Sequence, residues 1–164
     1  MGAVSAAEDS DGLAGVTGRE PWGVGAGIMP WIYPVVLTSW FIFPALLAGN
    51  AVLINPAEDT PLSALYIGQL AEEAGFPPGV INVLPGRGEI TGQCIAEHPG
   101  VRYISFTGSP GVGQSILRTC DRHGTRMKRE MGGNGSAIVL ADADPALALT
   151  PIRRSRPRPE APPG

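Results

Sequence analysis

The stretch Phe106-Thr107-Gly108-Ser109-Pro110-Gly111-Val112-Gly113 joins the end of an apolar strand pattern to a glycine-rich turn and the start of a helix pattern. Glycines in such a turn let the backbone come close to a diphosphate, and the amides at the start of the helix point toward it. The spacing is not Gly-x-Gly-x-x-Gly, so an ordinary strand-to-helix turn explains the glycines equally well. The stretch indicates a strand–turn–helix unit and leaves its ligand open.

A carboxylate ends the strand pattern that follows. Glu130 is succeeded by Met131-Gly132-Gly133, and these small residues leave space around the side chain. A general base needs such access to a reacting centre. The alternative is a surface salt bridge with Arg126 or Arg129, which is what a lone glutamate commonly forms.

Strand and helix patterns alternate through most of the chain. Short apolar runs bounded by glycine or proline predict strands, and apolar residues at helical spacing predict helices. The predicted strands are Gly23 to Met29, Ala51 to Ile54, Ile81 to Leu84, Arg102 to Phe106, Arg126 to Glu130 and Ser136 to Leu140; the predicted helices are Pro34 to Leu47, Pro61 to Gly75, Glu89 to Glu97 and Gly111 to Arg122. This order predicts an α/β fold with a doubly wound, Rossmann-like parallel sheet. Ligands of such sheets bind at the carboxyl ends of the strands.

The length of 164 residues allows one domain with one sizeable core. We expect residues 1–19, which are small, polar and acidic, to be disordered. Residues 20–145 form the predicted α/β domain. Residues 146–164 form a tail rich in arginine and proline that cannot pack into a core, and we expect it to be disordered as well.

Composition and charge exclude several classes of function. A net charge of −3 gives no basic field for nucleic acid. The segment Pro21 to Ala57 has no charged residue, but Pro30, Pro34 and Pro44 would break a membrane-spanning helix. Cys94 and Cys120 are far apart and have no partner at metal-ligand spacing, so we expect no metal, structural thiols and a cytoplasmic setting.

Two polar residues follow the second predicted strand. Glu58 lies where a carboxylate can accept hydrogen bonds from both hydroxyls of a ribose and repel a 2′-phosphate, which would favour NAD over NADP. A solvated loop acid beside Asp59 is the alternative. Asn55 could hydrogen-bond the same sugar or simply end the strand.

Taken together, these motifs resemble the coenzyme-binding domain of the NAD(P)-dependent aldehyde dehydrogenase superfamily. The resemblance extends from about Glu20 to Pro145. The matching blocks are Glu20-Pro21-Trp22-Gly23-Val24, Met29-Pro30-Trp31-Ile32-Tyr33-Pro34, Pro44-Ala45-Leu46-Leu47-Ala48-Gly49-Asn50, Asn55-Pro56-Ala57-Glu58, Phe106-Thr107-Gly108-Ser109 with Gly113, and Glu130-Met131-Gly132-Gly133-Asn134. Six blocks in the same order are a much more specific signal than any one of them.

The resemblance implies an oxidoreductase that oxidises an aldehyde to a carboxylic acid, with NAD, or alternatively NADP, as hydride acceptor. It implies that Glu130 is the general base for the thiol or the hydrolytic water. It also implies a set of coenzyme-binding residues: Pro30 and Trp31 beside the coenzyme, Asn55 and Glu58 at the adenosine ribose, Gly108, Ser109 and Gly113 at the diphosphate, and Gly132 next to the base. Full-length members of the family are homo-oligomers.

Three differences from the family pattern bear on activity. Ile32 stands where the family has an asparagine that holds the oxyanion, and Asn55 stands where it has a lysine. The family's nucleophilic cysteine lies beyond the glutamate, in a separate domain that is not recognisable here. We therefore expect an incomplete aldehyde dehydrogenase fold, a fragment that is inactive alone. The alternative is a non-catalytic module that binds a nucleotide or pairs with a partner.

Overall fold

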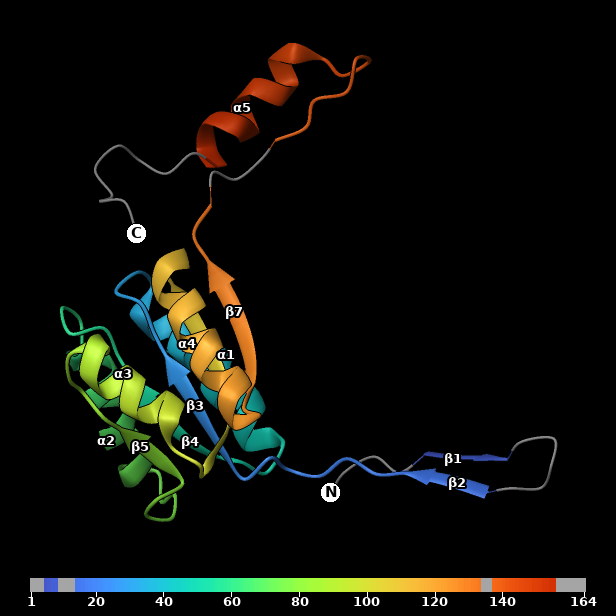
Figure 1. The fold of residues 1–164 in the computed structure, drawn as a ribbon. Helices are drawn as coiled ribbons and strands as arrows, with labels where there is room; N and C mark the ends of the chain where they lie inside the picture. Colours follow the sequence, from blue (N-terminus) through green and yellow to red (C-terminus); the bar gives the residue numbers. More distant parts are fainter. Residues whose placement is uncertain (1–4, 9–13, 134–136, 156–164) are drawn as a thin grey trace.

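A five-stranded parallel sheet forms the centre of the protein, as seen in a computed structural model that describes residues 5–8, 14–133 and 137–155 (Figure 1). The strand order is β5-β4-β3-β6-β7, and every pair of neighbours is parallel. The strands are β3 (Val24–Ile28), β4 (Ala51–Asn55), β5 (Ile81–Val83), β6 (Val101–Gly108) and β7 (Arg126–Met131). The chain winds outward from β3 in both directions, which confirms the predicted doubly wound α/β class.

Helices cover both faces of this sheet. On one face α1 (Pro34–Leu47) packs on β3 and β4, and α2 (Leu62–Glu73) packs on β5. On the other face α3 (Gly88–Glu97) contacts β3, β4 and β6, and α4 (Pro110–His123) contacts β6 and β7. In Figure 1 the pair α3 and α4 lies in front of the sheet and α1 lies behind it. The helix bounds are within one or two residues of those predicted from apolar spacing.

Each face of the sheet has its own apolar core. Side chains from β3 and β6 pack with α3 and α4, and the buried members are Ala26, Ile28, Ile95, Ala96, Val101, Ile104, Phe106, Ile116 and Cys120. The second core lies under α1 and α2 and contains Met29, Phe41, Ile42, Val52, Ile54 and Ala64. Alternate strand residues therefore point to opposite cores, as expected of a sheet buried on both faces.

The glycines of β3 make room for α1. A Cβ built on Gly27 would lie 2.6 Å from the ring of Phe41, and one built on Gly25 would lie 3.6 Å from the same ring. An alanine at position 27 would therefore push the helix away from the sheet. Gly25 and Gly27 therefore have a structural role under α1.

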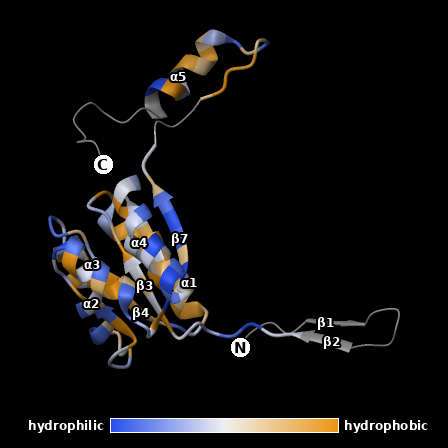
Figure 2. Ribbon diagram, in the orientation of Figure 1, coloured by the Kyte–Doolittle hydropathy of each residue, from blue (hydrophilic) through white to orange (hydrophobic). Residues whose placement is uncertain are grey.

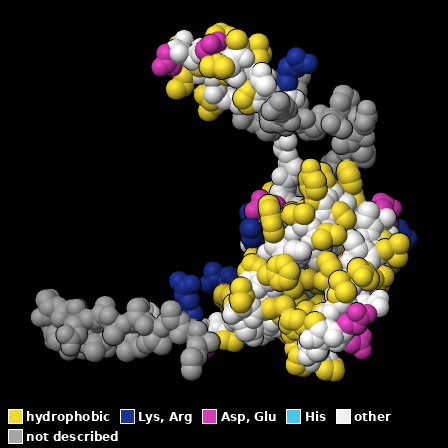
Figure 3. Space-filling view, turned by 180° about the vertical axis from the view of Figure 1, so that it is seen from behind, with side chains coloured by type: hydrophobic (Ala, Val, Ile, Leu, Met, Phe, Trp, Pro, Cys, Tyr) yellow, Lys and Arg dark blue, Asp and Glu magenta, His cyan; other side chains and the backbone are white. Residues whose placement is uncertain are grey.

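One face of the sheet is covered unevenly. Among the described helices, only α1 and α2 lie on the α1 side, and they contact β3, β4 and β5. Figure 3, seen from behind, shows hydrophobic side chains gathered over this face. Exposed apolar residues of α1 contribute to it, namely Val36, Trp40, Phe43 and Leu47. The edge strand β7 is mostly hydrophilic, as its blue colour in Figure 2 shows.

The structure differs from three expectations for the ends of the chain. Within the segment expected to be disordered, β1 (Ser5–Glu8) and β2 (Ala14–Thr17) pair as an antiparallel hairpin, because the two segments satisfy each other's backbone groups locally. Residues 137–140 are not a strand, because no described strand lies beside them, and Ile138 is 87% exposed. The start of the tail is helical, as α5 (Pro145–Ser155), since proline at the first position followed by alanine and leucine favours a helix. Position 136 and residues 156–164 lie outside the described residues.

The apolar segment Pro21 to Ala57 folds as β3, α1 and β4, which agrees with the strand, helix and strand predicted for it. None of the described helices has the length and apolarity that crossing a membrane requires.

Candidate functional site

The carboxyl ends of the five strands bring the predicted site residues to one edge of the sheet. In spatial order this edge is formed by residues 84–88, 55–58, 29–31, 107–113 and 130–132, which follow or end β5, β4, β3, β6 and β7. All nine predicted site residues lie in these segments. Pro30 and Gly132, which are more than a hundred residues apart in the sequence, thus lie at the same edge because the strands that precede them are parallel.

The glycine turn and the predicted base lie on neighbouring strands. Thr107 is the register partner of Glu130, and Gly108 is the partner of Met131. The amide of Gly132 donates a hydrogen bond to the carbonyl of Gly108 at 3.4 Å. The two motifs that the sequence suggested separately are therefore adjacent in space.

Packing explains both glycines of the turn without a ligand. A Cβ on Gly113 would lie 2.9 Å from the sulfur of Met131 and 3.0 Å from the ring of Phe106. A Cβ on Gly108 would lie 2.8 Å from the ring of Phe106. The helix α4 consequently approaches β6 and β7 closely, and its first turn, with Ser109 as N-cap and Pro110 at the first position, starts at the site edge. Close packing and backbone access to a diphosphate are compatible roles for the same residues.

The carboxylate of Glu130 is at the surface. Its Oε1 lies 3.3 Å from Nζ of Lys128, and the side chain of Glu130 is 62% exposed. A surface salt bridge of Glu130 was the alternative to a general base, and Arg126 or Arg129 was the expected partner. The structure instead pairs Glu130 with Lys128, two residues earlier on the same side of β7. The guanidinium of Arg126 instead lies over the ring of Trp22, 5.9 Å from its centroid. An exposed pair of this kind is worth about 0–1 kcal/mol, so it leaves the carboxylate free to act.

Glu130 and α4 lie on opposite faces of the sheet. Met127 packs against the core under α3 and α4, and Met131 contacts Gly113 of α4. Strand residues alternate, so Lys128 and Glu130 point to the α1 side. A molecule bound between the first turn of α4 and Glu130 would have to cross the sheet edge.

Asn55 is used inside the protein. It is 2% exposed, and its Nδ2 donates a hydrogen bond to the carbonyl of Leu84 at 2.9 Å. The amide of Leu84 in turn donates to the carbonyl of Ile54 at 2.8 Å. Of the two interpretations open for Asn55, this geometry favours the strand-ending one, because the amide is committed to the loop that follows β5.

Glu58 remains at the edge. Its Oε2 accepts a hydrogen bond from the amide of Gly88 at 3.2 Å, and the residue is exposed. This contact ties the loop after β4 to the start of α3. The fold thus places the segment Gly86-Arg87-Gly88 next to Glu58.

The turn after β3 carries backbone strain. Pro30 and Trp31 follow the strand, and Trp31 is 37% exposed. Tyr33 then has φ 47° and ψ 51°, the left-handed region, directly before Pro34 at the start of α1. A left-handed conformation costs a residue with a side chain about 1–2 kcal/mol. Ile32, between them, is 42% exposed and has no side-chain donor.

Neither cysteine lies at this edge. Cys94 is exposed on α3, and Cys120 is buried on α4. Burial raises the pKa of the Cys120 thiol, and the negative charge of Asp121 raises it further. Within the described part of the chain, no three of His, Cys, Asp and Glu gather as a metal site would require.

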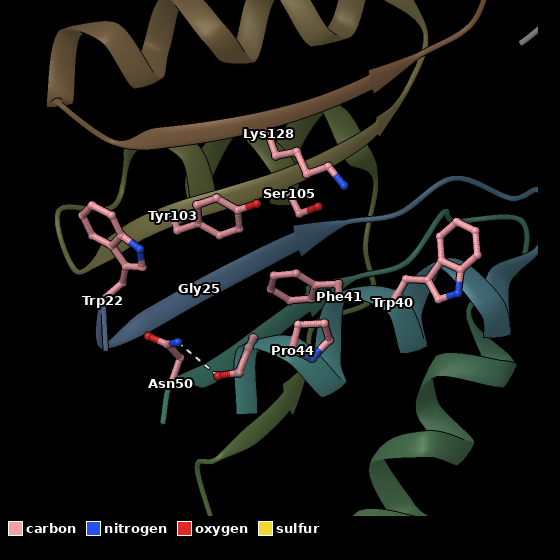
Figure 4. A pocket seen from close by; sticks show the side chains of 10 residues that line it. Trp22, Gly25, Trp40, Phe41, Pro44, Asn50, Tyr103, Ser105 and Lys128 are labelled. Carbon is pink, nitrogen blue, oxygen red and sulfur yellow. Dashed lines mark hydrogen bonds between the residues drawn. The ribbon is translucent and has the colours of Figure 1, made fainter. Parts of the chain in front are cut away.

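A cavity lies between α1 and the sheet, away from this edge. It has a volume of about 320 Å³ and opens between α1 and the bare side of β6 and β7. Figure 4 shows Trp22, Tyr103 and Lys128 around it, with Phe41 and Trp40 on the α1 side. Its lining is mainly apolar and aromatic, and Lys128 connects it to Glu130.

A doubly wound parallel sheet with its polar residues at the carboxyl edge defines the class of α/β proteins that bind ligands at that edge. The model of the aldehyde dehydrogenase family matches residues 2–156. The chain belongs to the aldehyde dehydrogenase family.

Individual relatives agree with this assignment. Retinal dehydrogenase 2 of Homo sapiens is 52% identical over 129 residues, and phenylacetaldehyde dehydrogenase of Pseudomonas fluorescens is 48% identical over 132 residues. These alignments cover 78% and 80% of this chain, and 25% and 26% of the relatives. The chain therefore spans about a quarter of the length of the curated relatives it matches.

Solved structures show the same fold. A putative aldehyde dehydrogenase from Burkholderia cenocepacia is 44% identical with a TM-score of 0.81, and the NAD⁺ complex of an aldehyde dehydrogenase from Bacillus cereus is 38% identical with a TM-score of 0.83. Each match covers 90% of this chain and 30% of the solved chain.

Proposed function

We propose that this chain is the coenzyme-binding part of an aldehyde dehydrogenase and that it binds NAD at the carboxyl edge of its sheet. The observation that carries the proposal is the register of Thr107 with Glu130, which puts the glycine turn beside the carboxylate. Membership of the family and the NAD⁺ complex of the Bacillus cereus relative support it.

The residues present fit a dinucleotide. The first turn of α4 begins beside Gly108 and Ser109, and the amides at the start of this helix can bind a diphosphate. Gly113, whose own amide donates to the carbonyl of Ser109, closes this turn. The exposed carboxylate of Glu58 lies after β4, where it can accept hydrogen bonds from ribose hydroxyls. Pro30 and Trp31 provide an apolar surface between these two positions. NAD, when bound, would supply the hydride acceptor for oxidation of an aldehyde.

Glu130 is the group that would move a proton. Its carboxylate is exposed and, within the described part of the chain, forms an ion pair only with the exposed Lys128, so it can accept a proton from a thiol or from a water molecule. Gly132 leaves the approach to it open, since a Cβ there would meet nothing within 4 Å. Ile32 cannot donate a hydrogen bond to an oxyanion, and removal of one such donor typically costs about 3 kcal/mol of barrier.

Asn55 enters this proposal as a positioning residue. Its buried amide holds the Leu84 carbonyl, so it stabilises the loop that meets Glu58 rather than offering its side chain to the sugar. Glu58 alone then faces the ribose, and its negative charge favours NAD over NADP. A cytoplasmic location fits the two free thiols, Cys94 and Cys120.

Calorimetric titration with NAD⁺ tests the proposal. We expect saturable binding to the wild-type chain, competition by AMP, and no oxidation of added aldehyde by this chain alone. Ser109→Glu places a negative charge at the first turn of α4 and should abolish binding. Ser115→Glu, on an exposed position further along the same helix, is the matched control and should leave binding intact. No heat of binding, or equal binding by the Ser109 variant, would refute the proposal.

A further inference from the structure

Three hydrogen bonds connect the loop after β5 to the end of β4. They join Leu84 to Ile54, Asn55 to Leu84, and Gly88 to Glu58. The loop between them is narrow, because a Cβ on Gly86 would overlap the hydroxyl of Thr91. The residue between the two glycines, Arg87, is therefore held in a defined place, directly before the amide that Glu58 binds.

The backbone of Arg87 is fixed as well. Its carbonyl accepts hydrogen bonds from the amides of Ile90 at 2.9 Å and Thr91 at 2.8 Å, which starts α3. Its side chain reaches back over the same turn, where Nη2 lies 3.3 Å from Oε2 of Glu89. The side chain of Arg87 is 68% exposed.

The Arg87 guanidinium is thus paired with the carboxylate of Glu89. Arg87 also directly precedes Gly88, whose amide donates a hydrogen bond to the carboxylate of Glu58. A guanidinium near the ribose carboxylate is the group that would recognise a 2′-phosphate, through paired N–H donors. Here that group is already paired with Glu89, and the three charges sum to −1. A 2′-phosphate would bring further negative charge beside two carboxylates.

Resting on the proposed function, we propose that the Arg87–Glu89 ion pair sets coenzyme choice, with Glu89 holding Arg87 away from a 2′-phosphate and Glu58 repelling it. Glu89 is then a specificity-determining residue for NAD over NADP. Removing its charge releases the guanidinium of a residue that directly precedes the Gly88 amide bound by Glu58. The pair is exposed, so the effect is moderate and falls with rising ionic strength.

Titration of NAD⁺ and NADP⁺ against four chains tests this inference: wild type, Glu89→Gln, Glu89→Gln with Arg87→Ala, and the control Glu97→Gln. Glu97 is an exposed glutamate at the C-terminal end of the same helix, and its carboxylate accepts a hydrogen bond from the side chain of Gln93. We expect the wild-type chain to bind NAD⁺ at least about tenfold more tightly than NADP⁺ because of like-charge repulsion. Glu89→Gln should tighten NADP⁺ about three- to fivefold, the range of an exposed ion pair, and change NAD⁺ by less than about twofold.

The added Arg87→Ala should remove that gain, and Glu97→Gln should change neither coenzyme. An unchanged ratio of the two affinities in Glu89→Gln, or the same gain in Glu97→Gln, would overturn the inference while NAD⁺ binding still stands. If neither coenzyme binds to the wild-type chain, the proposed function fails and this inference fails with it.

Discussion

The side-chain amide of Asn55 donates a hydrogen bond to the backbone carbonyl of Leu84 at 2.9 Å, across the carboxyl ends of β4 and β5. The contact is partly buried, and it holds the loop on which Arg87 and Gly88 lie. The edge at which a ligand would bind is thus supported from below by a polar residue that would not itself touch the ligand.

Asn55→Ala should lower the free energy of unfolding by about 1–3 kcal/mol, since the carbonyl of Leu84 would lose a partly buried hydrogen bond and the buried side chain of Asn55 would leave a gap. Urea denaturation followed by tryptophan fluorescence measures this. Glu58→Gln, an exposed change at the same loop, should alter stability by less than about 0.5 kcal/mol. If Asn55→Ala were as stable as wild type, the contact would have no structural importance.

Gly113→Ala should destabilise the protein by about 1–3 kcal/mol, because its Cβ would collide with Met131 and Phe106. Gly111→Ala, two residues earlier in the same helix, meets nothing within 4 Å and should stabilise by up to about 1 kcal/mol. Thermal denaturation of the pair compares them directly. Equal effects of the two substitutions would show that α4 can shift away from β7 at little cost.

Cys94 and Cys120 should differ in reactivity. Iodoacetamide should alkylate the exposed Cys94 in the native protein, whereas Cys120 should react only through unfolding. Peptide mass spectrometry over a time course separates the two sites. Comparable rates for both thiols would contradict the burial of Cys120.

Alkaline pH should destabilise the fold through Cys120. Burial raises the pKa of its thiol above the unfolded value of about 8.5, so the unfolded chain releases this proton first. Stability contributed by the neutral thiol is fully present below that unfolded pKa and is lost as the pH rises toward the folded one. Urea midpoints at pH values on both sides of this window should fall less in Cys120→Ala than in wild type.

Tyr33→Asn should raise stability by up to about 1 kcal/mol, because asparagine tolerates the left-handed conformation of this position better than tyrosine. The side chain of Tyr33 is largely exposed, so little packing is lost. Tyr66→Asn, at an exposed position in the middle of α2, should instead lower stability by a few tenths of a kcal/mol. A loss of stability on Tyr33→Asn larger than that of Tyr66→Asn would contradict the strain.

Much of this fold could be predicted because local patterns and tertiary packing agree. Pro34 begins α1 and Gly124 ends α4 in a left-handed conformation, as the sequence rules for helix ends require. The segment 137–140 could not be predicted correctly, because a strand pattern becomes a strand only beside a partner. The apolar residues of this segment predicted a strand, but the sequence does not show whether a partner strand lies beside them.

The site was predictable in position and only partly in detail. Parallel strands bring their carboxyl ends together, so the edge followed from the topology. Whether a given polar side chain faces outward depends on the neighbouring loop. The side chain of Asn55 is turned inward because the loop after β5 offers it the carbonyl of Leu84. The ion pair of Glu130 with Lys128 depended on strand alternation, which puts residues two apart on the same side.

The outer side of β7 has a consequence for handling the protein. Among the described strands none pairs with it beyond β6, so its unpaired amides and carbonyls form a template onto which another extended chain could add. Arg126, Lys128 and Arg129 place like charges along that template and oppose such growth. Salt that screens them, or a polyanion that neutralises them, should lower the concentration at which the protein precipitates. The ionic strength of the storage buffer should therefore affect how much of the protein stays in solution.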